Sequence, residues 1–175
     1  MVLSLFRKSA ATEHVYALYG AIVAQSRRPQ FYAEWGVPDT VTGRFDMISL
    51  HLALLFRRLK TESPSARAFS QALFDLFFKD MDRSLREMGA GDLAVPKKIQ
   101  KMTTIFYGLL ASLDAALAQG DVAAVEAVLV RNIYGGEPAV SARPLAAYVV
   151  AESRALAAQP ASELMAGRLG QGEAA

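Results

Sequence analysis

Apolar residues recur at intervals of three and four positions along most of this 175-residue chain. That spacing places them on one face of an α-helix, whereas a half-buried strand needs apolar and polar residues to alternate. No stretch alternates convincingly, so the pattern predicts an all-α protein. Hydrophobic residues make up 53% of the chain, which excludes a largely disordered chain and is enough for one buried core.

About six helices are predicted, at residues 9–28, 42–60, 64–88, 96–119, 122–134 and 143–158. Their ends carry recognisable signals: Ser63 and Pro64 begin one helix, Gly89 ends it, and Gly120 with Asp121 ends one helix and begins the next. We expect one compact helical domain over residues 1–160. Residues 161–175 are expected to form a short helix near 162–168 and a flexible tail.

The connection over residues 28–44 is the one long connection, and it is rich in aromatic residues. It holds two prolines and two glycines together with Phe31, Tyr32 and Trp35. Connecting segments are usually polar because they face water. These rings must therefore either pack across the domain or be presented to a partner.

Three lysines occupy the first turns of the helix that starts at Pro96, namely Lys97, Lys98 and Lys101. Cations there oppose the positive end of the helix dipole, so folding alone would favour acidic residues. Two explanations remain open. The lysines either pair with the acidic face of the preceding helix or contact an anionic partner.

The acidic residues of that preceding helix are explained without catalysis. Asp82 lies four positions before Arg86, and Arg83 lies four positions before Glu87, which is the spacing of surface ion pairs on a helix. We therefore expect no catalytic carboxylates here.

No residue pattern indicates an enzyme, a metal site or a bound cofactor. The chain contains no cysteine, which excludes disulfides, iron–sulfur clusters and a thiol nucleophile. Neither His14 nor His51 has a carboxylate or a second histidine three or four positions further along the chain, and no nucleotide-binding or nucleophile motif occurs. Met47 lies one turn before His51, which gives weak support to a haem pocket; an ordinary structural role for both histidines is favoured.

The net charge of +2 is too small for a generic nucleic-acid-binding protein, and no sequence-specific nucleic-acid partner is expected. Residues 1–60 nevertheless carry eight basic and four acidic side chains. This imbalance is compatible with scattered solvated charge, with binding to an anionic membrane surface or with binding to RNA.

No signal peptide or membrane span is predicted, since the most apolar stretch, residues 102–120, contains several polar residues. We expect a soluble intracellular protein.

Two segments resemble sequence motifs of a known family. FYAEWGVPDTVTGRFDMISLHLALLFRRL at Phe31–Leu59 and LFDLFFKDMDRSLREMGAGDLAVPKKIQKMTTIFYG at Leu73–Gly108 are similar to the ubiquinol–cytochrome c chaperone family, the assembly factors of respiratory complex III. The resemblance implies a non-enzymatic chaperone that binds newly made cytochrome b and supports assembly of ubiquinol–cytochrome c reductase.

The resemblance also suggests further partners and a location. Mitochondrial relatives work with a small partner protein and near the ribosome at the inner membrane. Because the sequence shows no long N-terminal targeting extension, we expect the bacterial form, peripheral at the cytoplasmic face of the inner membrane.

The same motifs suggest which residues bind a partner. A membrane-protein client exposes apolar helices, so its binder needs an apolar groove with charges at the rim. We expect aromatic rings to line that groove, namely Phe31, Tyr32, Trp35 and Tyr107. The rim is expected to carry Arg44, Lys97, Lys98 and Lys101, and the family motifs add Pro38, Asp39 and Arg86.

The residues are also compatible with two other functions. The aromatic and methionine content and a nearly uncharged helix would suit a carrier of haem or quinone. The basic first third would suit an adaptor that contacts the ribosome or RNA.

Overall fold

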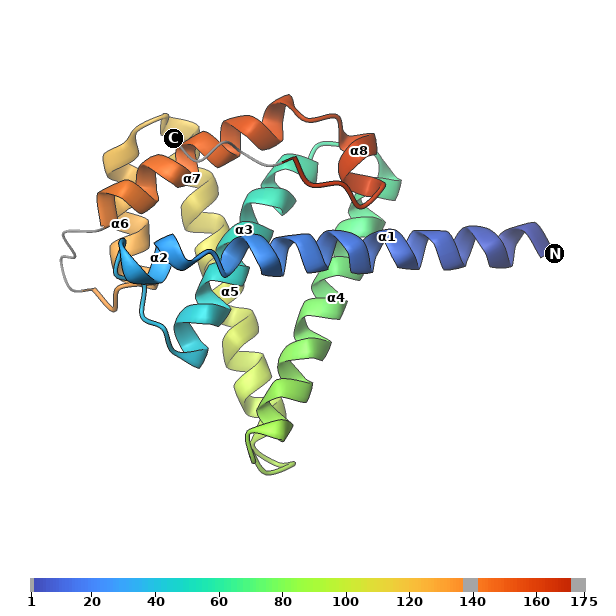
Figure 1. Ribbon diagram of the computed structural model, residues 1–175, viewed down its shortest axis with the longest axis horizontal. Helices are drawn as coiled ribbons and strands as arrows, with labels where there is room; N and C mark the ends of the chain where they lie inside the picture. The colour runs from blue at the N-terminus through green and yellow to red at the C-terminus, as the bar shows by residue number, and fades with distance from the viewer. Residues whose placement is uncertain (1, 137–141, 171–175) are drawn as a thin grey trace.

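The structure, a computed structural model, describes residues 2–136 and 142–170, and within these ranges every regular element is a helix. The helices are α1 (Val2–Ser26), α2 (Pro29–Ala33), α3 (Val41–Leu59), α4 (Pro64–Glu87), α5 (Val95–Gln119), α6 (Val122–Asn132), α7 (Ala142–Ala158) and α8 (Ala161–Met165). They form a single compact domain (Figure 1). The all-α prediction is therefore confirmed.

The predicted boundaries differ from the observed ones mainly at the start of the chain. Helix α1 begins at Val2 rather than near Ser9. The aromatic connection contains the short helix α2, which Pro29 begins and the buried side chain of Phe31 holds against the core. The expected caps are present: Ser63 accepts a hydrogen bond from the Ala66 amide, and Asp121 accepts one from the Ala123 amide.

Helix α3 is the centre of the domain. Its residues 45–55 are all buried, because α1, α4, α5 and α7 pack around it. The sequence pattern predicted a single apolar face for this helix. The structure buries polar side chains of the opposite face as well, including Asp46, Ser49 and His51.

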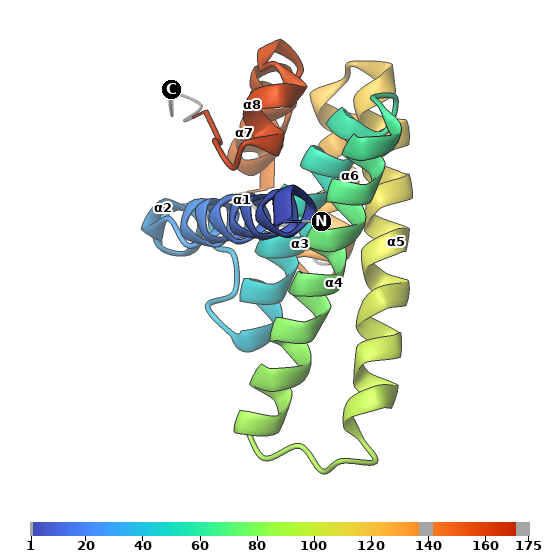
Figure 2. The same ribbon diagram turned by 90° about the vertical axis from the view of Figure 1, so that its right-hand side faces the viewer.

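Helices α4 and α5 run side by side and form a hairpin that extends away from the rest of the molecule (Figures 1 and 2). Residues 88–94 connect them and form the hairpin tip. Gly89, with φ +83°, ends α4, and Gly120, with φ +71°, ends α5. The two ends of α5 therefore lie at opposite ends of the hairpin.

Only one face of α5 is buried. Phe106, Leu109 and Leu113 face the core, whereas Ile105 and Tyr107 are exposed. The helical spacing of apolar residues predicted such a face, on a buried helix rather than a membrane span. In the part of the chain that the structure describes, no helix combines the length and the apolar character needed to cross a bilayer.

Helix α8 packs against α1 and α4 through the fully buried side chain of Leu164. The expected flexible tail falls on residues 171–175, which lie outside the described residues. The division of the chain at residue 160 stays a prediction.

Candidate functional site

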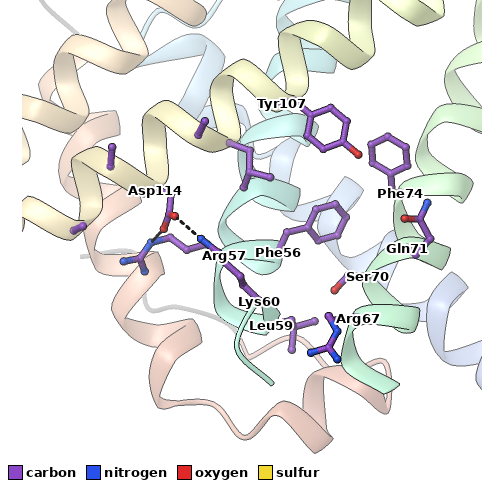
Figure 3. A pocket seen from close by; sticks show the side chains of 14 residues that line it. Phe56, Arg57, Leu59, Lys60, Arg67, Ser70, Gln71, Phe74, Tyr107 and Asp114 are labelled. Atoms are coloured by element: carbon purple, nitrogen blue, oxygen red, sulfur yellow. Dashed lines mark hydrogen bonds and ion pairs between the residues drawn. The ribbon is translucent and has the colours of Figure 1, made fainter. Parts of the chain in front are cut away.

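A groove of about 690 Å³ lies between the C-terminal end of α3, the N-terminal half of α4 and the C-terminal half of α5 (Figure 3). Its apolar part is formed by Phe56, Phe74, Tyr107 and Leu110, together with alanines of α5. The Phe74 and Tyr107 rings lie 5.6 Å apart between centroids, and both face the groove in Figure 3. A groove of this size and lining can take up an apolar side of a helix or a small apolar molecule.

One end of the groove is charged. Asp114 forms an ion pair with Arg57, at 2.9 Å between Oδ1 and Nε, and accepts a hydrogen bond from Lys60 Nζ, at 3.1 Å. Arg67 stands at the same groove and donates to the Glu62 carbonyl oxygen. The lining therefore carries three cations and one carboxylate, so this end has an excess of positive charge.

Tyr107 is the one predicted site residue in this groove, and the residue is 52% exposed. The adjacent Phe106 is fully buried and contacts both Phe56 and Phe74. Because neighbouring residues on a helix point in different directions, Phe106 anchors α5 to the core and leaves Tyr107 at the surface.

The aromatic residues of the connection lie elsewhere. Phe31 is 1% exposed, and its ring packs against Trp35, His51 and Tyr148 at centroid distances of 5.4, 5.7 and 5.0 Å. Trp35 and Tyr32 are half-buried. These rings close the core across the connection, and none of them lines the groove that contains Tyr107. The structure therefore does not unite the four predicted aromatic residues in one groove.

His51 belongs to a buried chain of hydrogen bonds. Its Nδ1 donates to the Met47 carbonyl oxygen at 2.7 Å, because a carbonyl can only accept, and its Nε2 accepts from the Tyr148 hydroxyl at 2.8 Å. Gln25 Nε2 in turn donates to Tyr148 and to Glu152. Burial lowers the pKa of His51 to about 4. Both ring nitrogens are occupied, so this histidine holds the core together and has no free nitrogen for a haem iron in this structure.

The remaining motif residues of the connection support the start of α3. Arg44 Nε donates to Asp39 Oδ1 at 2.8 Å, and both side chains are exposed. This partner raises the pKa of the Arg44 guanidinium. Pro38 follows the buried Val37, and its carbonyl oxygen accepts from the Thr40 amide at 2.8 Å. Pro38, Asp39 and Arg44 thus shape one local turn.

Arg86 ties α4 to the hairpin tip. Its Nε donates to Asp82 Oδ2 at 2.6 Å, and its Nη1 donates to Asp92 of the tip. Both carboxylates raise the pKa of the Arg86 guanidinium. The predicted ion pair with Asp82 is confirmed, as is the pair between Arg83 and Glu87, at 3.8 Å.

Lys97, Lys98 and Lys101 are exposed at the start of α5, and no ion pair of the described residues involves them. Asp80, Asp82 and Glu87 are paired with Arg83 and Arg86 instead. The explanation that these lysines pair with the acidic face of the preceding helix is therefore wrong. The arginines of the same helix reach those carboxylates over one turn, which leaves no need for a partner from α5.

Sequence reasoning missed the groove residues Phe56, Phe74 and Asp114, because helical periodicity assigns half-buried aromatic residues to the core. Asp114 carried a signal, since it is the only charge between residues 102 and 120. Among the described residues, no group of three or more histidines, aspartates and glutamates is arranged to hold a metal ion.

Comparison with known proteins gave three matches. A family model described as ubiquinol-cytochrome C chaperone matches residues 33–171. The curated protein named ubiquinol-cytochrome-c reductase complex assembly factor 1, from Xenopus laevis, is 22% identical over 116 residues, which cover 66% of this chain and 58% of that protein. This chain thus spans less than two thirds of that relative.

The third match is a solved structure, described as the crystal structure of the Cbp3 homolog from Brucella abortus. It shares 44% sequence identity with this chain and superposes with a TM-score of 0.85. The similarity covers 95% of this chain and 94% of that one, so the whole arrangement of helices is shared.

Proposed function

Because this chain belongs to the ubiquinol–cytochrome c chaperone family, we propose that it is a non-enzymatic chaperone that binds newly made cytochrome b during assembly of respiratory complex III. The chaperone role is that of the family, and the assembly role is that of the named relative from Xenopus laevis. Cytochrome b as the client, and the lack of catalysis, are the parts that we propose for this chain.

The groove of α3, α4 and α5 is the observation that best supports client binding. A membrane-spanning client exposes apolar helices before it is inserted or assembled, with charged residues at their ends. The groove offers aromatic rings along its length and an excess of positive charge at one end. An apolar helix with an acidic residue near its end would match both features.

We propose that the chaperone works peripherally at the cytoplasmic face of the inner membrane. Two further partners, a small partner protein and the ribosome, are proposed by analogy with mitochondrial relatives. The exposed parts of Tyr32 and Trp35, together with Arg44, offer a second surface for such a partner, separate from the groove.

The client is tested in cells that lack this protein. We expect less assembled complex III and less spectroscopically normal cytochrome b, while other respiratory complexes remain. A photo-crosslinking amino acid at Tyr107 should capture cytochrome b, and one at Trp35 tests the second surface. Normal complex III in the deletion strain would contradict the proposal.

A groove-filling variant tests the site itself. Ala111 lines the groove and is exposed, so Ala111→Trp should fill it without disturbing the core. Ala151→Trp, on the exposed face of α7, is the matched control. Complex III should fall only in the first variant. Equal assembly in both would show that the client binds elsewhere.

The volume of the groove also favours a second candidate, a carrier of an apolar small molecule such as quinone or haem, because ligand sites commonly have about 300–1,000 Å³. Native mass spectrometry separates the two candidates. A bare chain that shows no spectral change on haem titration would exclude the carrier. Ribosome contact requires co-sedimentation that falls steeply with salt.

A further inference from the structure

We propose that the hairpin tip docks on an anionic lipid surface, with Leu93 and Met88 entering the headgroup region and Lys97, Lys98 and Lys101 contacting anionic headgroups. This inference rests on the membrane-peripheral location proposed above, and it identifies the hairpin tip as the surface of the protein that binds the membrane.

Leu93 is 90% exposed, more than any other large apolar side chain within residues 11–136 and 142–170, and Met88 at the other end of the tip is 52% exposed. Single exposed apolar residues are common on protein surfaces and need no explanation. Here two of them bracket the tip of a hairpin that extends away from the rest of the molecule (Figure 1). A flat surface can therefore reach both before it meets the other helices.

The tip holds Leu93 outward through fixed contacts on both sides. The preceding Asp92 is bound by Arg86, and the Ala94 amide donates to the Gly91 carbonyl oxygen at 2.8 Å. Val95, two residues further on, is fully buried. Because its neighbours are anchored, the backbone of Leu93 is held at the tip.

The three lysines lie beside this apolar tip, on the first turns of α5. They are exposed and unpaired among the described residues, whereas the carboxylates nearby are each engaged by an arginine. The start of a helix disfavours cations, so folding does not account for three of them. An anionic surface does, since each lysine near such a surface contributes to binding.

The residues of the tip favour a membrane over RNA. Proteins that bind single-stranded nucleic acid stack the bases on aromatic side chains, and residues 88–101 contain none. Aliphatic side chains next to lysines are instead the combination that lies in a lipid interface, with the apolar groups among the headgroups and the cations above them.

The test uses the full chain and two kinds of vesicle, phosphatidylcholine alone and phosphatidylcholine mixed with phosphatidylglycerol. Co-sedimentation should occur with the mixed vesicles and weaken with salt. Replacing all three lysines by Gln should lower the partition coefficient roughly 100-fold. Leu93→Ser should lower it about tenfold through lost apolar burial.

Matched controls separate the tip from general charge and hydrophobicity. Arg131, Arg143 and Arg154 lie on α6 and α7, and changing all three to Gln removes the same charge far from the tip. Val41→Ser removes a 60% exposed apolar side chain at the start of α3. Both controls should bind vesicles within about twofold of the parent, since neither touches the docking surface.

The insertion of residue 93 into the lipid headgroup region can be measured separately by fluorescence. Because the chain has no cysteine, Leu93→Cys gives a single labelling site for an environment-sensitive fluorophore. Its emission should shift to the blue on mixed vesicles, while a label at Val41→Cys should not respond. Circular dichroism and thermal unfolding check that each variant is folded.

Equal binding to both kinds of vesicle, or undiminished binding of the folded triple-lysine and Leu93 variants, would overturn the proposal. Salt-sensitive binding to single-stranded RNA without binding to vesicles would also overturn it. The vesicles contain no cytochrome b, so a negative result here leaves the proposed client intact. Conversely, normal complex III in the deletion strain would contradict the proposed client but would not affect the conclusion drawn from vesicle binding.

Discussion

Two buried ionisable side chains of α3 make opposite contributions to the pH dependence of stability. Burial raises the pKa of Asp46 from 3.8 to about 7 and lowers the pKa of His51 from 6.5 to about 4. Between pH 4 and 6.5 the folded chain therefore holds a proton on Asp46 that the unfolded chain has lost. The unfolded chain holds a proton on His51 that the folded chain lacks. As pH rises, the first effect lowers stability and the second raises it, so they largely cancel.

Asp46→Asn should reveal the contribution of His51. Above pH 7 the variant should be more stable by about 2 kcal/mol, because it no longer buries a charged carboxylate. Between pH 6.5 and 4 its free energy of unfolding should fall by about 1.4 kcal/mol for each pH unit of acidification. Urea unfolding at a series of pH values measures both effects. A variant whose stability stays flat over this range would contradict the assignment of a neutral His51.

At the scale of elements, the start of α3 fits closely against the connection that precedes it. A Cβ atom at Gly43 would lie 2.0 Å from the Pro38 carbonyl oxygen, a distance that backbone atoms cannot tolerate. Gly43→Ala should therefore destabilise the protein by about 3 kcal/mol, since the connection has to move. Gly108, in the middle of α5, has open space around it, and Gly108→Ala should stabilise by about 0.5–1 kcal/mol. Thermal unfolding compares the two; similar small shifts would show that the connection adapts freely.

The lysines of α5 allow a second test at this scale. Changing Lys97, Lys98 and Lys101 together to Glu should leave stability unchanged or raise it by about 1–2 kcal/mol, because acidic residues suit the start of a helix. Lys79→Glu, in the body of α4, controls for a general effect of added negative charge. Urea unfolding at low salt gives the comparison. Lower stability of the triple variant would mean that the lysines support the fold, and the reasoning for an anionic partner would lose its basis.

Helix caps and apolar periodicity depend only on residues close together in the chain. The positions of the helices could therefore be predicted from the sequence. Ser63, Gly120 and Asp121 act where they were expected to act. The contacts between helices depend on packing between segments that are distant in the chain. Apolar periodicity does not predict these contacts. For that reason the sequence grouped Tyr107 with Phe31 and Trp35, although the structure gives them different neighbours. The exposure of Leu93 could not be predicted from the sequence either, because a leucine in a short turn is usually expected to be buried in the core.

At the scale of the whole molecule, α5 joins the two proposed surfaces. Its first turns carry the lysines of the hairpin tip, and its second half lines the groove with Tyr107 and Asp114. At about 1.5 Å per residue, Lys97 and Asp114 are separated by roughly 25 Å along the helix. A chaperone docked through the tip would hold its groove at this height above the membrane, near the cytoplasmic ends of a client's helices.

This arrangement predicts that the two surfaces can be inactivated separately. Leu93→Ser combined with the triple Lys→Gln change should lower complex III because the chaperone leaves the membrane. A transmembrane anchor fused before α1, whose N-terminal end extends beyond the other helices in Figure 1, should restore assembly. The same anchor should not rescue Ala111→Trp, since that variant is at the membrane but cannot hold its client. Spectra of cytochrome b in isolated membranes give the readout. Rescue of both variants, or normal assembly by the unanchored tip variant, would show that membrane docking and client binding are not divided between these surfaces.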